Sequence, residues 1–198
     1  MEIEVKYQTD ENQAAALFAH PLLAPYLGPR RRVPMAAVYY DTAQGGCTAA
    51  GFALRLRQEG PARICTVKGG AMVQGVARRT EIEVEAATLE QGVAALLARP
   101  DLPAGWGAVL RQPMVERARM EFVRVAADYT RRGLGMELCH DTGFIEANGR
   151  RAPIGECELE HKQGPEEDFL LLVQQVQQSL GWEPWSRSKY DRARELMG

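Results

Sequence analysis

Several segments of this chain alternate charged and apolar residues with a period of two. Residues 2–7 read Glu-Ile-Glu-Val-Lys-Tyr, and residues 52–58, 78–85, 114–127 and 151–162 carry related patterns. A period of two is typical of a β-strand, because successive side chains point to opposite faces of the sheet. A single strand of this kind is usually half-buried, with its polar face in water. Its recurrence along one chain requires a further explanation.

The charged faces of these strands contain almost only Arg, Lys and Glu. A solvated sheet face normally mixes Thr, Gln and Ser with its charges. Two arrangements explain the difference: an outer face covered by a salt-bridge lattice, or a barrel with a polar interior and an apolar exterior. The residues that share a face are Glu2, Glu4 and Lys6; Arg55 and Arg57; Arg79, Glu81 and Glu83; Arg117 and Arg119; and Glu156, Glu158 and Glu160.

Amphipathic helices are available to cover an apolar exterior. Asp10 and Thr88 are N-cap residues for predicted helices over residues 14–18 and 89–97, and a longer helix is predicted over residues 166–180. A short helix follows over residues 191–197. We therefore predict an α+β fold, in which a closed antiparallel barrel carries helices on its outside. Nothing in the composition divides the chain, so we expect one domain over residues 1–198.

Composition narrows the class of protein. The chain has 198 residues and a formal net charge of −2, which argues against a general nucleic-acid binder. No apolar run approaches the ~20 residues of a membrane span, and the charged N-terminal strand does not resemble a signal peptide. The four cysteines form no C-x-x-C pair, so we interpret them as reduced thiols. These features predict a cytoplasmic protein.

The mixture of charges indicates the chemistry of a barrel interior. Arg and Lys suit phosphate oxygens, with Arg adding a forked geometry. Clustered carboxylates suit Mg²⁺ or Mn²⁺, which prefer hard oxygen ligands. Together they indicate a polyanion bound with metal ions. We find no Ser-His-Asp or Cys-His set for covalent catalysis. The glycines at 69, 70 and 75 lack the G-K-[ST] of a phosphate-binding loop, so we interpret them as a hairpin connection.

An ordered set of short motifs runs from residue 2 to about residue 190. The motifs are Glu2-x-Glu4-x-Lys6, Tyr39-Tyr40-Asp41-Thr42, Leu54-Arg55-Leu56-Arg57, Thr66-Val67-Lys68-Gly69, Arg79-x-Glu81-x-Glu83, Arg117-x-Arg119, Asp141-x-Gly143, Glu156-x-Glu158-Leu159-Glu160 and Ser186-x-Ser188-Lys189-Tyr190. In this order they resemble the motifs of the CYTH domain family, also called the triphosphate tunnel metalloenzymes.

The resemblance implies a tunnel of about eight antiparallel strands that binds a triphosphate with Mg²⁺ or Mn²⁺. It implies metal ligands at Glu2, Glu4, Glu156 and Glu158, and ligands or positioning groups at Glu81, Glu83, Asp141 and Glu160. Phosphate contacts are implied at Lys6, Arg55, Arg57, Lys68, Arg79, Arg117, Arg119 and Lys189. Of these residues, Glu4, Lys6, Glu158 and Lys189 are expected to be catalytic.

Within that family we expect hydrolysis of inorganic tripolyphosphate to pyrophosphate and phosphate, by attack of a metal-activated water. Thiamine triphosphatases and class IV adenylyl cyclases are alternatives, since the tunnel motifs do not separate them. A non-catalytic module that binds polyphosphate or a nucleotide is a third, but its binding would gain little from several carboxylates. The expected partner is a small triphosphate, with no nucleic acid and no membrane, and the resemblance is compatible with a homodimer.

Overall fold

A computed structural model describes residues 1–198, apart from the side chain of Met72. The strands are β1 (Glu2–Gln8), β2 (Arg31–Thr42), β3 (Phe52–Glu59), β4 (Ala62–Val73), β5 (Val76–Glu85), β6 (Met114–Arg131), β7 (Leu134–Ala147) and β8 (Arg150–Gln163). The helices are α1 (Glu11–Phe18), α2 (Gly46–Ala49), α3 (Leu89–Leu97), α4 (Ala104–Leu110), α5 (Glu166–Leu180) and α6 (Lys189–Met197), with a 3₁₀ turn at Ala24–Tyr26.

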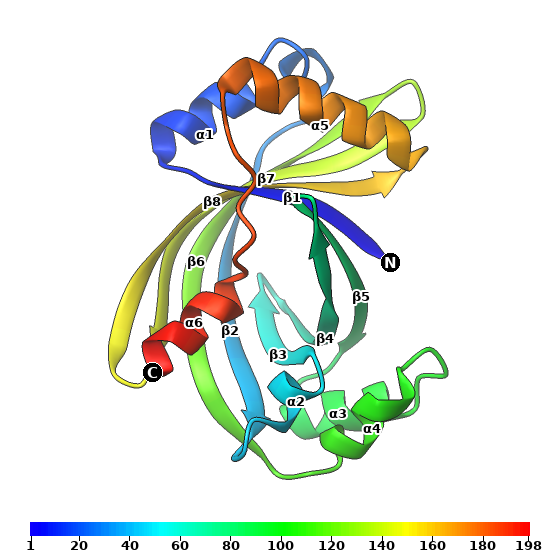
Figure 1. The fold of residues 1–198 in the computed structure, drawn as a ribbon, viewed down its shortest axis with the longest axis vertical. Coiled ribbons are helices and arrows are strands. Elements are labelled where there is room, and N and C mark those ends of the chain that lie inside the picture. The colour runs from blue at the N-terminus through cyan, green and yellow to red at the C-terminus, as the bar shows by residue number, and fades with distance from the viewer.

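The strands close into one antiparallel barrel in the order β1-β5-β4-β3-β2-β6-β7-β8 (Figure 1). Strand β1 completes the ring by pairing with β5 on one side and β8 on the other. This arrangement confirms the predicted barrel and the choice of a polar interior over an external lattice. None of the helices described in the structure combines the length and hydropathy that a membrane span requires.

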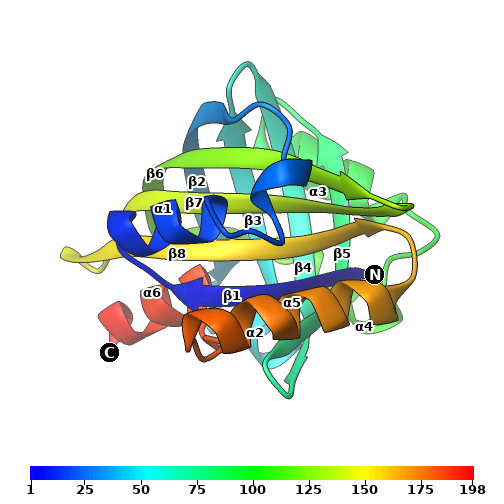
Figure 2. The ribbon, with the colours of Figure 1, turned by 90° about the horizontal axis from the view of Figure 1, so that it is seen from above.

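The helices cover the apolar outer face of the barrel. Figure 2 shows α1 and α5 lying across β1 and β8, where Leu17 and Phe169 join Val5 and Leu138 in one core cluster. On the opposite side, α3 and α4 cover β3 to β5 (Figure 1). Outward-facing residues of β1 are therefore apolar, while its charged residues face inward, as the alternation predicts.

The predicted helix N-termini are formed as expected. Asp10 accepts a hydrogen bond from the backbone N–H of Gln13 in a capping box, and Thr88 accepts one from Gln91. Ser188 caps α6 in a second capping box with Asp191. Because Ser188 fixes where α6 begins, it also fixes the position of the next residue, Lys189.

One local prediction is wrong. Gly69 and Gly70 are not in a loop but inside β4, which continues to Val73 before the chain turns. Gly70 has φ +150, and a Cβ there would lie 2.4 Å from the carbonyl oxygen of Arg78 on β5. The glycine therefore permits a close approach of two paired strands, a use of glycine that short-range turn signals do not distinguish from a loop.

Candidate active site

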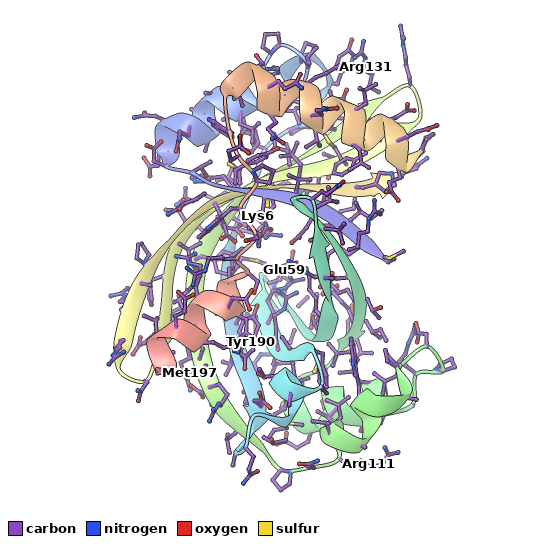
Figure 3. The ribbon with its side chains drawn as sticks, in the orientation of Figure 1. Lys6, Glu59, Arg111, Arg131, Tyr190 and Met197 are labelled. Atoms are coloured by element: carbon purple, nitrogen blue, oxygen red, sulfur yellow. The ribbon has the colours of Figure 1, made fainter. Side chains whose placement is uncertain are left out.

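The barrel encloses a cavity of about 610 Å³, within the size range of small-molecule sites. Most of the charged residues predicted from the sequence line it. They are Glu2, Glu4, Lys6, Arg55, Arg57, Lys68, Arg79, Glu81, Glu83, Glu158, Glu160 and Lys189. Figure 3 shows Lys6 and Glu59 directed toward this interior and Tyr190 of α6 beside it, whereas Arg111 and Arg131 lie on the outside.

Strands β1 and β8 place a lysine among carboxylates. Their register sets Lys6 opposite Glu158 and Glu4 opposite Glu160. The Lys6 Nζ lies 3.2 Å from Glu158 and 3.8 Å from Glu4. Burial lowers the pKa of Lys6, but Glu156, Glu158 and Glu4 outweigh it and raise that pKa above its usual value. Lys6 is therefore a permanently charged cation inside the barrel.

Strands β3, β4 and β5 supply the second charged wall. Arg55 lies 3.3 Å from Glu81, and Arg57 lies 3.6 Å from Glu83. The Nε atoms of Arg55 and Arg57 are buried and have no hydrogen-bond partner among the described side chains. A buried donor without an acceptor is costly, so both arginines have hydrogen-bonding capacity that an anion in the cavity would satisfy.

Lys68 lies close to the carboxylates of β1 and β5. Its Nζ lies 2.6 Å from Glu2, 3.7 Å from Glu4 and 3.8 Å from Glu81. Arg79 forms a further ion pair with Glu4. These cations neutralise the carboxylates, and both sets of groups lie at the wall of the cavity.

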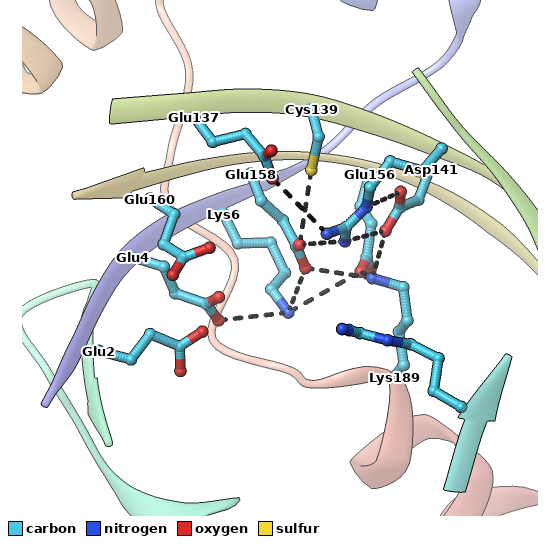
Figure 4. Close-up of polar contacts among 12 residues, drawn as sticks. Glu2, Glu4, Lys6, Glu137, Cys139, Asp141, Glu156, Glu158, Glu160 and Lys189 are labelled. Carbon is cyan, nitrogen blue, oxygen red and sulfur yellow. Dashed lines mark hydrogen bonds and ion pairs between the residues drawn. The ribbon is translucent and has the colours of Figure 1, made fainter. Parts of the chain in front are cut away.

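A buried ion-pair cluster lies at the end of the site formed by β6, β7, β8 and α6 (Figure 4). Arg124 donates to both oxygens of Asp141, at 2.8 Å and 2.7 Å, and to Glu158 at 2.9 Å. Lys189 lies 2.8 Å from Asp141 and 3.1 Å from Glu158. Arg124 was missing from the sequence prediction, although it lines the cavity. It has the inward parity of β6, shared with Met120 and Phe122.

The two arginines predicted on β6 do not line the cavity. Arg119 lies on the outside, with its side chain 62% exposed and paired to Glu116. Arg117 is half-buried at a register shift, where Tyr39 pairs with Ala118 and the next residue of β2 pairs with Glu116. The lining residues of β6 are Met120, Phe122 and Arg124, so Arg119, which is one residue out of phase with them, faces outward and lies outside the cavity lining.

Two predicted acidic residues also lie outside the cavity lining. Asp141 is buried and held by Arg124 and Lys189. Glu156 is 0% exposed and is surrounded by Lys6, Lys189 and Arg192. Ion pairs thus hold both carboxylates outside the cavity lining. Asp141 lies in the middle of β7 and not at a turn, because β7 runs without interruption through the D-x-G segment.

Helix α6 brings two residues of the Ser-Lys-Tyr motif to the cavity. Lys189 enters the acidic cluster, and Tyr190 stacks on Tyr39 of β2 with ring centroids 4.9 Å apart. The neighbouring Asp41 is buried and accepts hydrogen bonds from Thr42, Cys47 and Thr48, which fixes the turn after β2. The aromatic-Asp-Thr motif therefore supports the wall on which α6 rests.

The carboxylates of β1 and β8 offer hard oxygen ligands to a divalent cation, whereas the compact group of potential ligands among the described residues is Cys139, Asp141 and Glu158, whose ligand atoms lie within 4.8 Å of one another. Glu2 Oε2 is buried and lacks a hydrogen-bond partner among the described side chains. Burial raises the pKa of Glu2 to about 8. Burial and Glu158 also favour the neutral form of Glu4, but Lys68, Lys6 and Arg79 outweigh them and lower its pKa to about 2. The hard oxygens of Glu2, Glu4 and Glu158 match the preference of Mg²⁺.

The fold and the lining together define a closed barrel whose interior carries clustered carboxylates and arginines with unpartnered Nε donors. The chain belongs to the CYTH domain family, whose profile matches residues 1–187. The predicted family is thus confirmed. No curated protein matches the chain.

Solved structures of related fold cover almost the whole chain. A candidate adenylyl cyclase from Hippeastrum, described as having a dominant triphosphatase activity, is 20% identical with a TM-score of 0.65, covering 100% of this chain and 97% of that one. A candidate adenylate cyclase from Bacillus halodurans is 17% identical with a TM-score of 0.57, covering 97% and 96%. A protein from Pyrococcus horikoshii is 15% identical with a TM-score of 0.52, covering 98% and 96%. At these identities the likeness establishes the fold.

Proposed function

We propose that this protein hydrolyses a triphosphate in its barrel with the help of divalent metal ions, and that inorganic tripolyphosphate is a substrate. The observation that carries the proposal is the pairing, in one cavity, of arginines with unpartnered donors and glutamates that fit a metal. The family membership and the activity described for the Hippeastrum protein support the same reaction class. The cytoplasmic location expected from the sequence is part of this proposal, supported by four buried free thiols.

The cations of the two charged walls would bind the phosphate chain. Arg55, Arg57 and Arg124 offer forked donors to non-bridging oxygens, whereas Lys6 and Lys189 offer point charges. A substrate oxygen would replace the cavity-facing carboxylates that these groups now contact. Held by cations on several sides, the terminal phosphoryl group would be fixed in position and its developing charge stabilised.

Glu2, Glu4 and Glu158 would hold the metal, with Glu160 close enough in register to assist. Bound Mg²⁺ or Mn²⁺ supplies charge neutralisation and lowers the pKa of a coordinated water. Burial and Glu158 favour the neutral form of Glu4, but Lys68, Lys6 and Arg79 outweigh them and hold its pKa at about 2. The chain therefore presents Glu4 already ionised to a metal ion. We assign Glu4, Lys6, Glu158 and Lys189 to the reacting centre.

A second candidate function follows from an uncharged part of the lining. Strands β2 and β6 contribute Tyr39, Met120 and Phe122 to the cavity, together with Ala37. An inorganic triphosphate makes no use of such a wall, whereas an organic group attached to the triphosphate would lie against it. This favours a triphosphate ester such as thiamine triphosphate or a nucleotide as the alternative substrate, including the cyclase reaction on a nucleotide.

The first test is phosphate release from tripolyphosphate, thiamine triphosphate, ATP and pyrophosphate with Mg²⁺, with Mn²⁺ and with a chelator. Metal-dependent turnover fastest on tripolyphosphate is the expected result. Faster turnover of an ester would support the second candidate. Tight binding of triphosphates without turnover, and without cyclic product from ATP, would indicate that the protein is a binding module and not an enzyme.

A further inference from the structure

Glu156 is a fully buried carboxylate whose ion-pair partners are Lys6, Lys189 and Arg192. It lies on β8 two residues before Glu158, so both side chains point to the inside of the barrel. Glu158 lines the cavity, whereas Glu156 does not. Glu156 forms a hydrogen bond with Lys189, and it lies 3.8 Å from Lys6 and 3.5 Å from Arg192.

The same two lysines contact both carboxylates (Figure 4). Lys6 Nζ lies 3.8 Å from Glu156 and 3.2 Å from Glu158, and Lys189 Nζ lies 3.1 Å from Glu158 while donating to Glu156. Each ammonium group thus lies between a carboxylate that faces the cavity and one behind it. If Glu158 binds a metal ion, its attraction for the lysines weakens, and Glu156 remains as the buried carboxylate that both lysines contact.

Arg192 makes Glu156 a poor metal ligand. Glu156 Oε2 and Arg192 Nη1 both lack a hydrogen bond among the described side chains, but they face each other at 3.5 Å. A divalent cation at Oε2 would be repelled by Arg192, Lys6 and Lys189 at close range. Glu158 also has three cationic partners, but it lines the cavity, whereas Glu156 does not. The Glu156 carboxylate also anchors α6 to β8, because it contacts both Lys189 and Arg192, which are one helical turn apart on that helix.

We infer that Glu156 is a positioning residue, which holds the ammonium groups of Lys6 and Lys189 at the wall of the cavity for contact with the phosphate chain. This inference rests on the proposed function, since it concerns how the site binds a triphosphate. It replaces the role expected from the sequence, in which Glu156 is a metal ligand.

The test compares Glu156→Gln with Glu160→Gln, a matched change at a glutamate of the same strand that does line the cavity. For each protein we would measure KM and kcat for tripolyphosphate, the Mg²⁺ concentration at half-maximal activity, and tripolyphosphate affinity by calorimetry. Glu156→Gln is expected to raise KM and the dissociation constant by about tenfold or more, since a buried partner of two charges is lost. Its Mg²⁺ half-saturation is expected to stay within about twofold of the wild type.

Glu160→Gln is expected to show the opposite pattern, with a shifted Mg²⁺ half-saturation. A wild-type KM and affinity in folded Glu156→Gln would overturn the inference, as would a shift in Mg²⁺ half-saturation without a change in KM. If Glu156→Gln does not fold, as judged by circular dichroism, Glu156→Asp is measured against the same criteria. Arg192→Gln separates anchoring of α6 from positioning of the lysines, and it is expected to change KM by less than about threefold.

The outcome for the wild type separates this inference from the proposed function. If the wild type binds or hydrolyses the substrate and the Glu156 variants have an unchanged KM, only the positioning role of Glu156 is excluded. A wild type that neither binds nor hydrolyses tripolyphosphate or any ester in the panel removes the proposed function, and the inference with it.

Discussion

Tyr190 stacks on Tyr39, with ring centroids 4.9 Å apart and an angle of 10° between the ring planes. The first residue belongs to a C-terminal helix and the second to β2, so the contact joins segments about three quarters of the chain apart. Both rings are buried and belong to one apolar cluster with Met120 and Phe122. The stack therefore fixes α6, and Lys189 with it, against the barrel wall.

Tyr190→Ala is expected to destabilise the protein by about 3 kcal/mol, because a buried aromatic ring is replaced by a cavity. It should also raise KM for the triphosphate, since Lys189 loses its neighbouring anchor. Thermal unfolding and steady-state kinetics check the two effects. Tyr190→Phe, which keeps the ring, is the control and should retain most of the stability and a KM near the wild-type value.

Arg57→Ala is expected to lower kcat/KM by about 100-fold or more, because it removes a forked donor from the site of developing charge. The matched control is Arg119→Ala, which removes an arginine from the outside of the same barrel. That variant should keep kcat/KM within about twofold, since an exposed ion pair contributes little. Equal losses in both variants would contradict the placement of the site.

Arg124→Gln is expected to destabilise folding by about 3 kcal/mol or more, because it breaks a buried two-point pair with Asp141. The comparison is Arg31→Gln, which breaks a similar pair with Asp128 where both side chains are largely exposed. The exposed pair should cost below about 1 kcal/mol. Urea denaturation of both variants, with a common m-value, gives the difference. Similar losses would show that burial of the Arg124 pair does not matter.

Metal affinity is expected to increase with pH up to about pH 8. Burial raises the pKa of Glu2 to about 8, so a proton must leave Glu2 before its oxygens can bind the ion. Below that pKa, affinity through this group should fall by up to about tenfold per pH unit. Titration of Mg²⁺ or Mn²⁺ at pH 6, 7 and 8 measures the slope. Glu2→Gln should flatten it, and an unchanged slope in this variant would exclude Glu2 as its source.

The same pKa shift has a consequence for folding. A carboxyl whose pKa is higher in the folded state than its ordinary value of 4.5 binds its proton more tightly when folded. Its contribution to stability is complete below pH 4.5 and is lost as the pH rises toward 8. Glu4 behaves oppositely, because its lowered pKa of about 2 gives stability that is lost as the pH falls from 4.5 to 2.

Period-two alternation was sufficient to predict which charged side chains of most strands face the interior. It assigns Glu2, Glu4 and Lys6 to one face of β1, and closure of the barrel makes that face the interior. The motifs of β3, β4 and β5 follow the same rule. Parity within one regular strand is a local property, so it can be read from the residues alone.

The errors occur where the inward phase of a strand has to be chosen. On β6 the inward residues are Met120, Phe122 and Arg124, so Arg119 is one residue out of phase with them, and Arg117 lies at a register shift between β2 and β6. Glu156 shares its parity with Glu158 and Glu160, yet the depth of each in the barrel depends on α6. Alternation cannot report depth, because buried and cavity-facing positions of one strand have the same phase.

The closing pair β1 and β8 has a consequence for the order of folding. Lys6 meets Glu158 only when strands about 150 residues apart in the chain align, and the backbone N–H of Trp185 bonds to the carbonyl of Lys6 just before α6. Synthesis must therefore pass Lys189 before the groups assigned to the proposed reacting centre can assemble. On the ribosome, the nascent chain would carry the Glu-x-Glu-x-Lys segment long before the barrel around it could close.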